Sequence, residues 1–310
     1  MPPSDARSIP NEVKMENIVQ LDSPKPLKMQ WPTIISVTIF HALAGLGLFY
    51  FSWQNLALAV VLWWVTVSLG IGLAYHRLLT HRGFKSPTWL EYLLTFCGTL
   101  ALQSGPISWV STHRMHHAFT ETDKDPHSPT GGLYWAHIGW IFRGTAQNQT
   151  METMERYAPD LTKDKVHLFM NKYYWVSSVM LGAVLFFGGM FIGGFEMGFG
   201  ALLWGVFVRT LMGWHSTWLV NSVTHTWGYR RFETTDTSTN NALVAALAFG
   251  EGWHNNHHAH PRSAKHGLTW KEFDFNWMQI RILQKLGLAT DVYAFSLSDK
   301  VNSQKLKKAA

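Results

Sequence analysis

The chain has 310 residues, of which 47% are hydrophobic and only 15% are charged, well below the quarter that is usual in soluble domains. Its 16 tryptophans suit a membrane protein, because Trp and Tyr gather at membrane–water interfaces. The net charge of +6 is better explained by Lys and Arg flanking membrane segments than by nucleic-acid binding. A single cysteine, Cys97, excludes an intrachain disulfide and a cysteine-based metal site.

Residues 1–30 are polar and rich in proline, which predicts a flexible leader. The apolar runs at 33–51 and 56–75 each have about the length that crosses a bilayer. Positive residues flank this pair of runs and are missing from the turn between them: Lys25, Lys28, Arg77, Arg82 and Lys85. The positive-inside rule therefore predicts a transmembrane hairpin with both ends in the cytoplasm.

The apolar run at 89–109 is predicted to lie at the interface or to re-enter the membrane without crossing it. A full crossing would place His113 and His76 on opposite sides of the membrane, where they could not share a site. Glu91, Gln103 and the pair Gly105 and Pro106 also weaken a spanning helix.

A soluble stretch then leads to two more apolar runs, at 173–195 and 199–220, whose turn again lacks positive charge. Arg209 is costly in hydrocarbon, so we expect it to face protein or to reach the interface. Residues from 226 onward are predicted to be cytosolic, and 298–310 form a frayed basic tail. The fold class is an all-α integral membrane protein, with residues 31–297 as one domain. It has four transmembrane helices in two hairpins and a cytosolic helical cap.

Nine of the 16 histidines fall in four short motifs: HRLLTH (His76, His81), HRMHH (His113, His116, His117), NSVTH (Asn221, His225) and HNNHH (His254, His257, His258). Residues three or four apart share a helix face, so the histidines of HRMHH project together, and so do those of HNNHH. His76 and His81 are five apart and should lie at a helix end or a local bulge. The four motifs predict one metal site at the membrane surface.

Nine imidazoles exceed the ligands of one ion, so two metal ions are expected. Imidazole ligands suit zinc, copper, iron or nickel, and ligand type alone does not select one. Nearby carboxylates could orient the rings or form a solvated face: Glu121, Asp123, Asp125, Asp236 and Glu251. Five of the seven other histidines are interpreted as ordinary core or surface residues: His41, His137, His167, His215 and His266. Redox-active iron with dioxygen fits an apolar substrate best.

The combined motifs HRLLTHRGF, HRMHHAFTETDKDPHS, NSVTH and GEGWHNNHHAHP resemble the integral-membrane fatty acyl desaturases of the delta-9, stearoyl-type branch. The resemblance covers roughly residues 33–295, and it is closest to cyanobacterial and plastid acyl-lipid desaturases. It implies insertion of a cis double bond into a saturated acyl chain, using dioxygen and two electrons at a non-haem di-iron centre.

By motif position, the resemblance assigns one iron to His76, His81, His113, His117 and His257. It assigns the other to His116, His225, His254 and His258, with Asn221 reaching this iron through a water. The bend of the acyl tunnel matches Gln103, Trp109 and Thr217. Trp109 could otherwise be one more interfacial aromatic residue.

The substrate is expected to be an acyl chain on a membrane glycerolipid, with acyl-CoA as the alternative. Acyl-CoA members carry clustered Lys and Arg after the motif matching Gly139 and Trp140, whereas residues 143–157 here hold two arginines offset by two glutamates. No haem-binding domain is recognised after residue 295, so electrons are expected from a separate ferredoxin, or from cytochrome b5. A thylakoid or plasma membrane location follows if the chain is cyanobacterial.

Three other functions fit parts of the pattern. A di-iron hydroxylase or ketolase would share the scaffold and give an alcohol or a ketone where a desaturase gives an alkene. A metal transporter would line an ion path with histidines, but these sit at membrane exits and not at mid-span. A structural zinc protein would bind metal without turnover.

Overall fold

The structure is a computed structural model that describes residues 28–144 and 150–298, and within these ranges the regular structure is helical. The first half contains α1 (Trp31–Gly47), η2 (Leu48–Tyr50), α2 (Trp53–Trp63), η3 (Trp64–Thr80), α3 (Thr88–Thr99), α4 (Pro106–Phe119), η4 (Pro129–Gly131), η5 (Trp135–Gly139) and α5 (Trp140–Phe142). The second half contains α6 (Met151–Tyr157), α7 (Lys165–Lys172), α8 (Tyr174–Leu202), η6 (Leu203–Val208), α9 (Arg209–Ser222), η7 (Val223–His225), α10 (Ala242–Leu247), α11 (His254–Ala259) and α12 (Phe275–Lys285).

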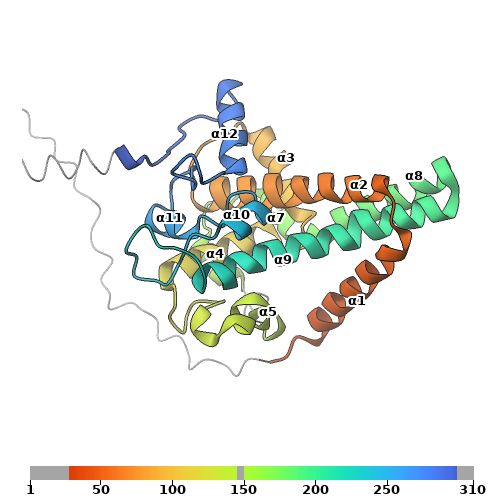
Figure 1. The fold of residues 1–310 in the computed structure, drawn as a ribbon, viewed down its shortest axis with the longest axis horizontal. Coiled ribbons are helices and arrows are strands. Elements are labelled where there is room, and N and C mark those ends of the chain that lie inside the picture. Colours follow the sequence, from red (N-terminus) through yellow and green to blue (C-terminus); the bar gives the residue numbers. More distant parts are fainter. Residues whose placement is uncertain (1–27, 145–149, 299–310) are drawn as a thin grey trace, which may run out of the picture.

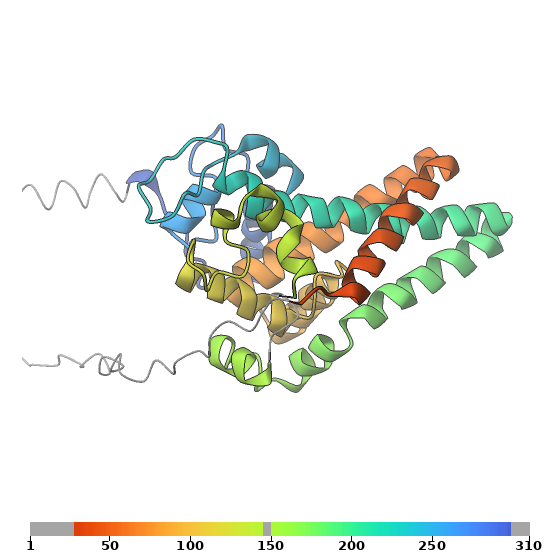
Figure 2. The same cartoon turned by 90° about the horizontal axis from the view of Figure 1, so that it is seen from below.

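Three continuous helical stretches of the described chain are long and apolar enough to cross a membrane: Trp31–Tyr50, Trp53–Thr80 and Tyr174–His225. In Figures 1 and 2 these long helices extend to one side, and the short helices gather at their other end. The polar part of the chain is therefore collected at one end of an apolar helical layer.

The stretch Tyr174–His225 turns back on itself inside α8. Gly193 and Gly194 have non-helical dihedral angles, and Gly194 has a φ of 81°, which favours glycine. The two arms pack so closely that a Cβ on Gly198 would lie 2.3 Å from the carbonyl oxygen of Phe186. Figure 2 shows the reversal at the end of the green helix. Small residues permit this close antiparallel packing.

The second long helix continues past the predicted end at residue 75 and reaches Thr80. Its last 17 residues, η3, form a π-helix, in which hydrogen bonds join residues five apart. His76 therefore lies inside this helix, and not at its exit as the sequence pattern suggested.

The apolar run at 89–109 is not one segment, because α3 ends at Thr99 and α4 begins at Pro106. Leu102 and Ser104 between them have positive φ angles of 54° and 76°. The run is not among the candidate spans, which agrees with the expectation that it does not cross the membrane. α3 packs tightly on η3, since a Cβ on Gly70 would lie 2.4 Å from the backbone nitrogen of Gly98.

Arg209 is completely buried and faces protein, as expected for a charge within an apolar run. Its guanidinium donates to the carbonyl oxygens of Gly205 at 3.0 Å and Leu100 at 2.5 Å. The predicted leader (1–30) and basic tail (298–310) lie almost entirely outside the described residues.

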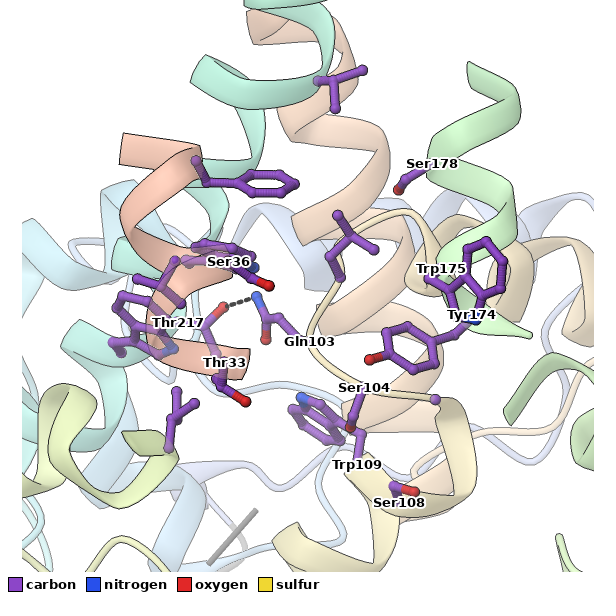
Figure 3. Close-up of a pocket in the computed structure, with 18 of the residues that line it drawn as sticks. Thr33, Ser36, Gln103, Ser104, Ser108, Trp109, Tyr174, Trp175, Ser178 and Thr217 are labelled. Atoms are coloured by element: carbon purple, nitrogen blue, oxygen red, sulfur yellow. Dashed lines mark hydrogen bonds between the residues drawn. The ribbon is translucent and has the colours of Figure 1, made fainter. Parts of the chain in front are cut away.

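A cavity of about 1030 Å³ lies between α1 and α8. Residues of η6 and α9 form another part of its wall, and the loop between α3 and α4 closes its polar end. Figure 3 shows Thr33 and Ser36 of α1 across the cavity from Tyr174, Trp175 and Ser178 of α8.

Candidate metal centre

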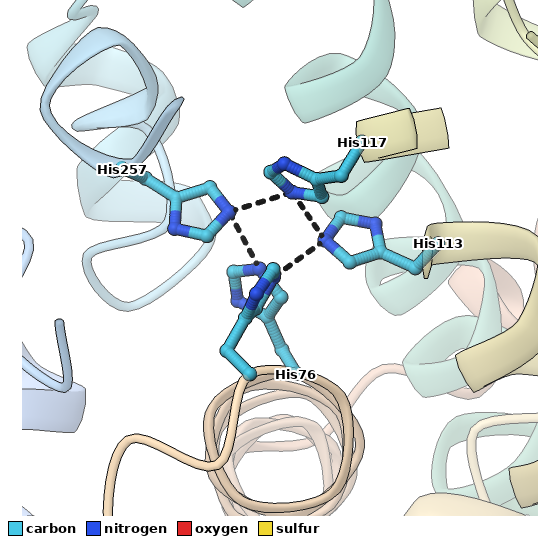
Figure 4. Close-up of side chains that lie close together, drawn as sticks. His76, His113, His117 and His257 are labelled. Atoms are coloured by element: carbon cyan, nitrogen blue, oxygen red, sulfur yellow. Dashed lines mark hydrogen bonds between the residues drawn. The ribbon is translucent and has the colours of Figure 1, made fainter. Parts of the chain in front are cut away.

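Five histidines from three separate parts of the chain meet at one point. Their ring nitrogens lie within 4.8 Å of one another, and we call them the first histidine group: His76, His81, His113, His117 and His257. The Nε2 atoms are 3.2 Å apart between His76 and His257, and 3.0 Å apart between His257 and His117. Figure 4 shows the rings of His76, His113, His117 and His257 pointing toward a common centre.

Four more histidines form a second histidine group by the same criterion: His116, His225, His254 and His258. The Nε2 atoms of His254 and His225 are 3.1 Å apart, and those of His116 and His258 are 3.4 Å apart. All nine histidines of the four motifs thus take part in one of two adjacent groups.

The helical spacing distributes the histidines between the groups. On α4, His113 and His117 are four residues apart and point to the first group, whereas His116 points to the second. On α11 the order is reversed, because His254 and His258 join the second group. Each helix contributes to both groups, so the two sites lie side by side.

The π-helix brings His76 and His81 together. The backbone N–H of His81 donates to the carbonyl oxygen of His76 at 3.1 Å, and the ring centroids are 4.8 Å apart. A regular α-helix places residues five apart on different faces, whereas a π-helical turn aligns them. The expected local bulge is confirmed, in the form of a long π-helical end.

Four of the five carboxylates named from the sequence contact the Nδ1 atom of a histidine. These pairs are His76–Glu251 at 2.7 Å, His116–Asp125 at 3.0 Å, His225–Glu121 at 3.3 Å and His258–Asp236 at 2.8 Å. Burial raises the pKa of Asp236, but the hydrogen bond from His258 outweighs it and holds the pKa well below its usual value. The carboxylates are therefore ionised, and they can accept hydrogen bonds from the Nδ1–H groups of the rings. Asp123 is exposed and makes no such contact.

The hydrogen-bonding pattern fits a cation in each group. A carboxylate only accepts, so the paired Nδ1 atoms of His116 and His258 carry the proton and their Nε2 atoms have only a lone pair. Burial keeps the rings neutral, because it lowers the pKa of His116 to about 3 and also lowers that of His258. Two acceptors 3.4 Å apart repel each other unless a cation lies between them. Neutral imidazoles are also the ligands that transition metals prefer.

Asn221 and two of the three tunnel residues named from the sequence, Trp109 and Thr217, lie beside the histidines, whereas Gln103 lines only the larger cavity. A small cavity of about 40 Å³ is lined by both histidine groups and by these residues: His76, His113, His254, Asn221, Trp109 and Thr217. The larger cavity shares Asn221, Trp109, Thr217 and His113 with it, so the two are adjacent.

The residues expected at the tunnel bend hold one another in place. The Gln103 side-chain amide donates to the Thr217 hydroxyl at 2.9 Å, as Figure 3 shows. The Trp109 ring stacks on His113, with centroids 5.1 Å apart. Because Trp109 contacts a histidine of the first group, it is not merely an interfacial aromatic residue.

Residues 21–281 match the protein family described as fatty acid desaturase. This chain belongs to the fatty acid desaturase family. Membership makes the protein an oxidoreductase that acts on acyl chains, and it explains a deep apolar cavity that ends at paired histidine groups.

The desaturase is 48% identical to the sn-1 stearoyl-lipid 9-desaturase of Anabaena variabilis over 250 residues. This alignment covers 81% of this chain and 87% of the relative. The desaturase is 44% identical over 266 residues to the sn-2 palmitoyl-lipid 9-desaturase of Nostoc sp. (strain 36), covering 86% and 90%. It is 43% identical over 274 residues to the icosanoyl-CoA 5-desaturase of Limnanthes douglasii, covering 88% and 74%. These relatives differ in the acyl carrier and in the position of the double bond.

Sequence reasoning missed the buried ion network beneath the desaturase's first histidine group. Arg77 is fully buried and contacts Glu251 at 2.9 Å and Asp274 at 2.9 Å. Burial would raise the pKa of Glu251, but Arg77 and His76 outweigh it and hold that pKa well below its usual value. The position of Arg77 directly after His76 was the available signal. A residue next to a ligand in a helix can anchor that ligand's own carboxylate partner.

Two further histidines of the desaturase adjoin the groups. His266 lies 3.2 Å from Glu251, and His127 lies 3.9 Å from Asp125. His266 is buried, as expected of a core residue, and it also shares the carboxylate that contacts His76. His41, His137 and His215 are half-buried and bond to one another, and they belong to neither histidine group.

Proposed function

We propose that the protein is a delta-9 acyl-lipid desaturase, which inserts a cis double bond between carbons nine and ten of a saturated acyl chain esterified to a membrane glycerolipid. One observation favours a glycerolipid over coenzyme A as the carrier of the acyl chain. Among the described residues that line the large cavity, none is Asp, Glu, Lys or Arg. Recognition of nucleotide phosphates requires clustered cationic donors, which this cavity lacks. The names of the Anabaena and Nostoc relatives also support an acyl-lipid substrate and the ninth carbon.

Two iron ions are the proposed cofactors, one in each histidine group, with Asn221 contacting the second through a water. Bound there, they would supply the redox chemistry by which dioxygen and two electrons remove two hydrogens from the chain. The carboxylates orient the rings of His116 and His258 by accepting from Nδ1, which leaves the Nε2 atoms of these two histidines free for metal. Gln103, Trp109 and Thr217 would shape the wall that presents one carbon pair to the irons.

We infer that the protein crosses the membrane four times as two hairpins within one domain, residues 31–297, with 89–109 at the interface. The apolar length of the helices and the reversal at Gly193 and Gly194 support this arrangement. Both termini and the metal site would face the cytoplasm, because positive residues flank the metal side. Thiol labelling tests this in a Cys97→Ala background. A membrane-impermeant maleimide outside the cell should label Glu196→Cys and not Ser303→Cys.

The electron donor is proposed to be a separate ferredoxin, with cytochrome b5 as the alternative, in a thylakoid or plasma membrane. Purified desaturase with each reduced donor tests this directly. Turnover with cytochrome b5 and none with ferredoxin would reverse the assignment.

The function is tested by mass spectrometry of fatty acids from cells that supply reduced ferredoxin and express either the wild type or His257→Ala. We expect new monoenes with the double bond at carbon nine, absent in the variant, and enriched in glycerolipids. Appearance first in the acyl-CoA pool would favour the alternative carrier, which the Limnanthes relative's name describes. Formation of a hydroxy acid would show that the protein is a hydroxylase and not a desaturase. Metal uptake without any new fatty acid would favour a metal transporter.

A further inference from the structure

The large cavity is open sideways between α1 and α8. Several of its lining residues are exposed: Pro32 and Ser36 on α1, and Trp175, Val179 and Ala183 on α8. A side chain that both lines a cavity and is exposed marks an opening. Val179 is 61% exposed and Trp175 is 52% exposed. Both helices belong to candidate membrane spans, so this opening faces lipid.

The two helices are held apart because each packs on a third element. The Phe40 ring of α1 packs against Phe207 of η6, with centroids 4.9 Å apart. On the other side, a Cβ on Gly182 of α8 would lie 3.5 Å from the side chain of Val206 in the same segment. The cavity is the space between these two packed sides, and Figure 3 shows both walls.

The opening leads to the histidines without meeting a charged residue. Trp109, Thr217 and Asn221 line both the large cavity and the small one that touches both histidine groups. An apolar chain can pass along this wall, whereas a charged headgroup would find no described partner inside it and would lose its hydration. Serine and threonine hydroxyls near the start of α1 and the α3–α4 loop can instead accommodate an ester: Thr33, Ser36, Ser104 and Ser108.

We propose that the gap between α1 and α8 is a lateral portal, through which one acyl chain of a membrane diacylglycerolipid enters while its headgroup and second chain stay outside. This inference rests on the proposed acyl-lipid substrate and adds the route. A two-chain lipid that entered from the water would have to expose its second chain, which the hydrophobic effect opposes. Sideways entry keeps both chains out of water throughout.

The portal is tested with neighbouring substitutions on the same helix. Ala183→Trp places a bulky ring at the opening, whereas Val184→Trp adds the same ring at a position that is 67% exposed and does not line the cavity. We expect Ala183→Trp to lower kcat/KM for glycerolipid about tenfold or more with unchanged iron content, as expected when access limits turnover. Val184→Trp should match the wild type. Ser36→Trp and Ile35→Trp form the same pair on α1.

A second readout does not depend on turnover. A diacylglycerolipid with a photoreactive diazirine in one chain is incorporated into nanodiscs, and crosslinked peptides are mapped by mass spectrometry. Labels on the peptides that contain Trp109 and Thr217, lost in Ala183→Trp and kept in Val184→Trp, would support the portal. Labels only on outward-facing residues would overturn the portal. Full activity of both Ala183→Trp and Ser36→Trp would also overturn it. Correct labelling without desaturation would instead refute the proposed function alone.

Discussion

At the residue scale, the chemistry of the site depends on which ring nitrogen of each histidine carries the proton. Four carboxylates each lie within 3.3 Å of the Nδ1 atom of one histidine, which keeps the proton on Nδ1 and leaves the Nε2 lone pair facing inward. Three of these carboxylates serve the second histidine group, and Glu251 serves the first. Orientation by a buried carboxylate also raises the basicity of the ligand.

Removing one of these charges should weaken metal binding. We expect Asp236→Asn to lower iron affinity about 10- to 100-fold, because the amide no longer attracts the Nδ1 proton of His258 as strongly. Iron retained during dialysis against graded chelator measures the effect. Asp123→Asn, in an exposed carboxylate outside the contacts, is the control. Equal iron retention in both variants would mean that Asp236 only holds its loop.

Arg77 should be important for stability because it compensates two buried carboxylates. We expect Arg77→Met to destabilise the fold by about 3–5 kcal/mol, since Glu251 and Asp274 would keep an uncompensated buried charge. Denaturant unfolding of the metal-free protein in detergent measures this. Arg82→Met removes an ion pair whose arginine side chain is 63% exposed, and it should cost at most about 1 kcal/mol. Similar costs for both variants would contradict the assigned role.

At the element scale, the π-helix and its contact with α3 position the first ligands. Seventeen residues of π-helix set the register of His76 and His81, and α3 lies against the same segment. The contact requires glycine on both helices, since a Cβ on Gly98 would lie 2.3 Å from the Tyr75 ring. Tyr75 directly precedes His76, so this packing supports a ligand.

Filling the helix contact should therefore disturb the fold. Gly70→Ala would place a methyl group 2.4 Å from the backbone of Gly98, and we expect a loss of about 1–3 kcal/mol with lower iron content. Gly45→Ala in α1 has no atom within 4 Å of the new Cβ and should be neutral or slightly stabilising. Thermal unfolding followed by tryptophan fluorescence compares the two. An unchanged Gly70→Ala protein would show that α3 can shift without consequence.

At the scale of the whole molecule, the metal centre joins segments that are far apart in the chain. The first histidine group alone combines η3, α4 and α11, and the second adds η7. A metal that binds only this assembly shifts the folding equilibrium toward it, by about 2.7 kcal/mol at a free concentration 100 times its Kd.

Metal removal should accordingly lower the melting temperature. We expect the protein to melt at a higher temperature with ferrous iron than with chelator, and His257→Ala to lose much of this difference. His167→Ala is the control, because this buried histidine lies outside both groups and contacts Glu91 and Asp164. It should lower both melting temperatures and keep the difference between them. No response to iron in the wild type would exclude an assembled metal site.

Much of this organisation could be predicted from the chain alone. The apolar runs, the four histidine motifs and the carboxylates beside them are local patterns, because hydropathy and helical spacing depend on neighbouring residues. For the same reason the sequence indicated that His76 and His81 require an irregular helix, and that Arg209 must face protein.

Other features were decided only by tertiary contacts. The break between α3 and α4, the Arg77 network and the placement of His266 against Glu251 depend on partners up to about two hundred residues apart. The sideways opening of the cavity likewise depends on α1 and α8 both packing on η6. Spacing along a helix determines which side chains can share a face, but only packing determines which faces meet.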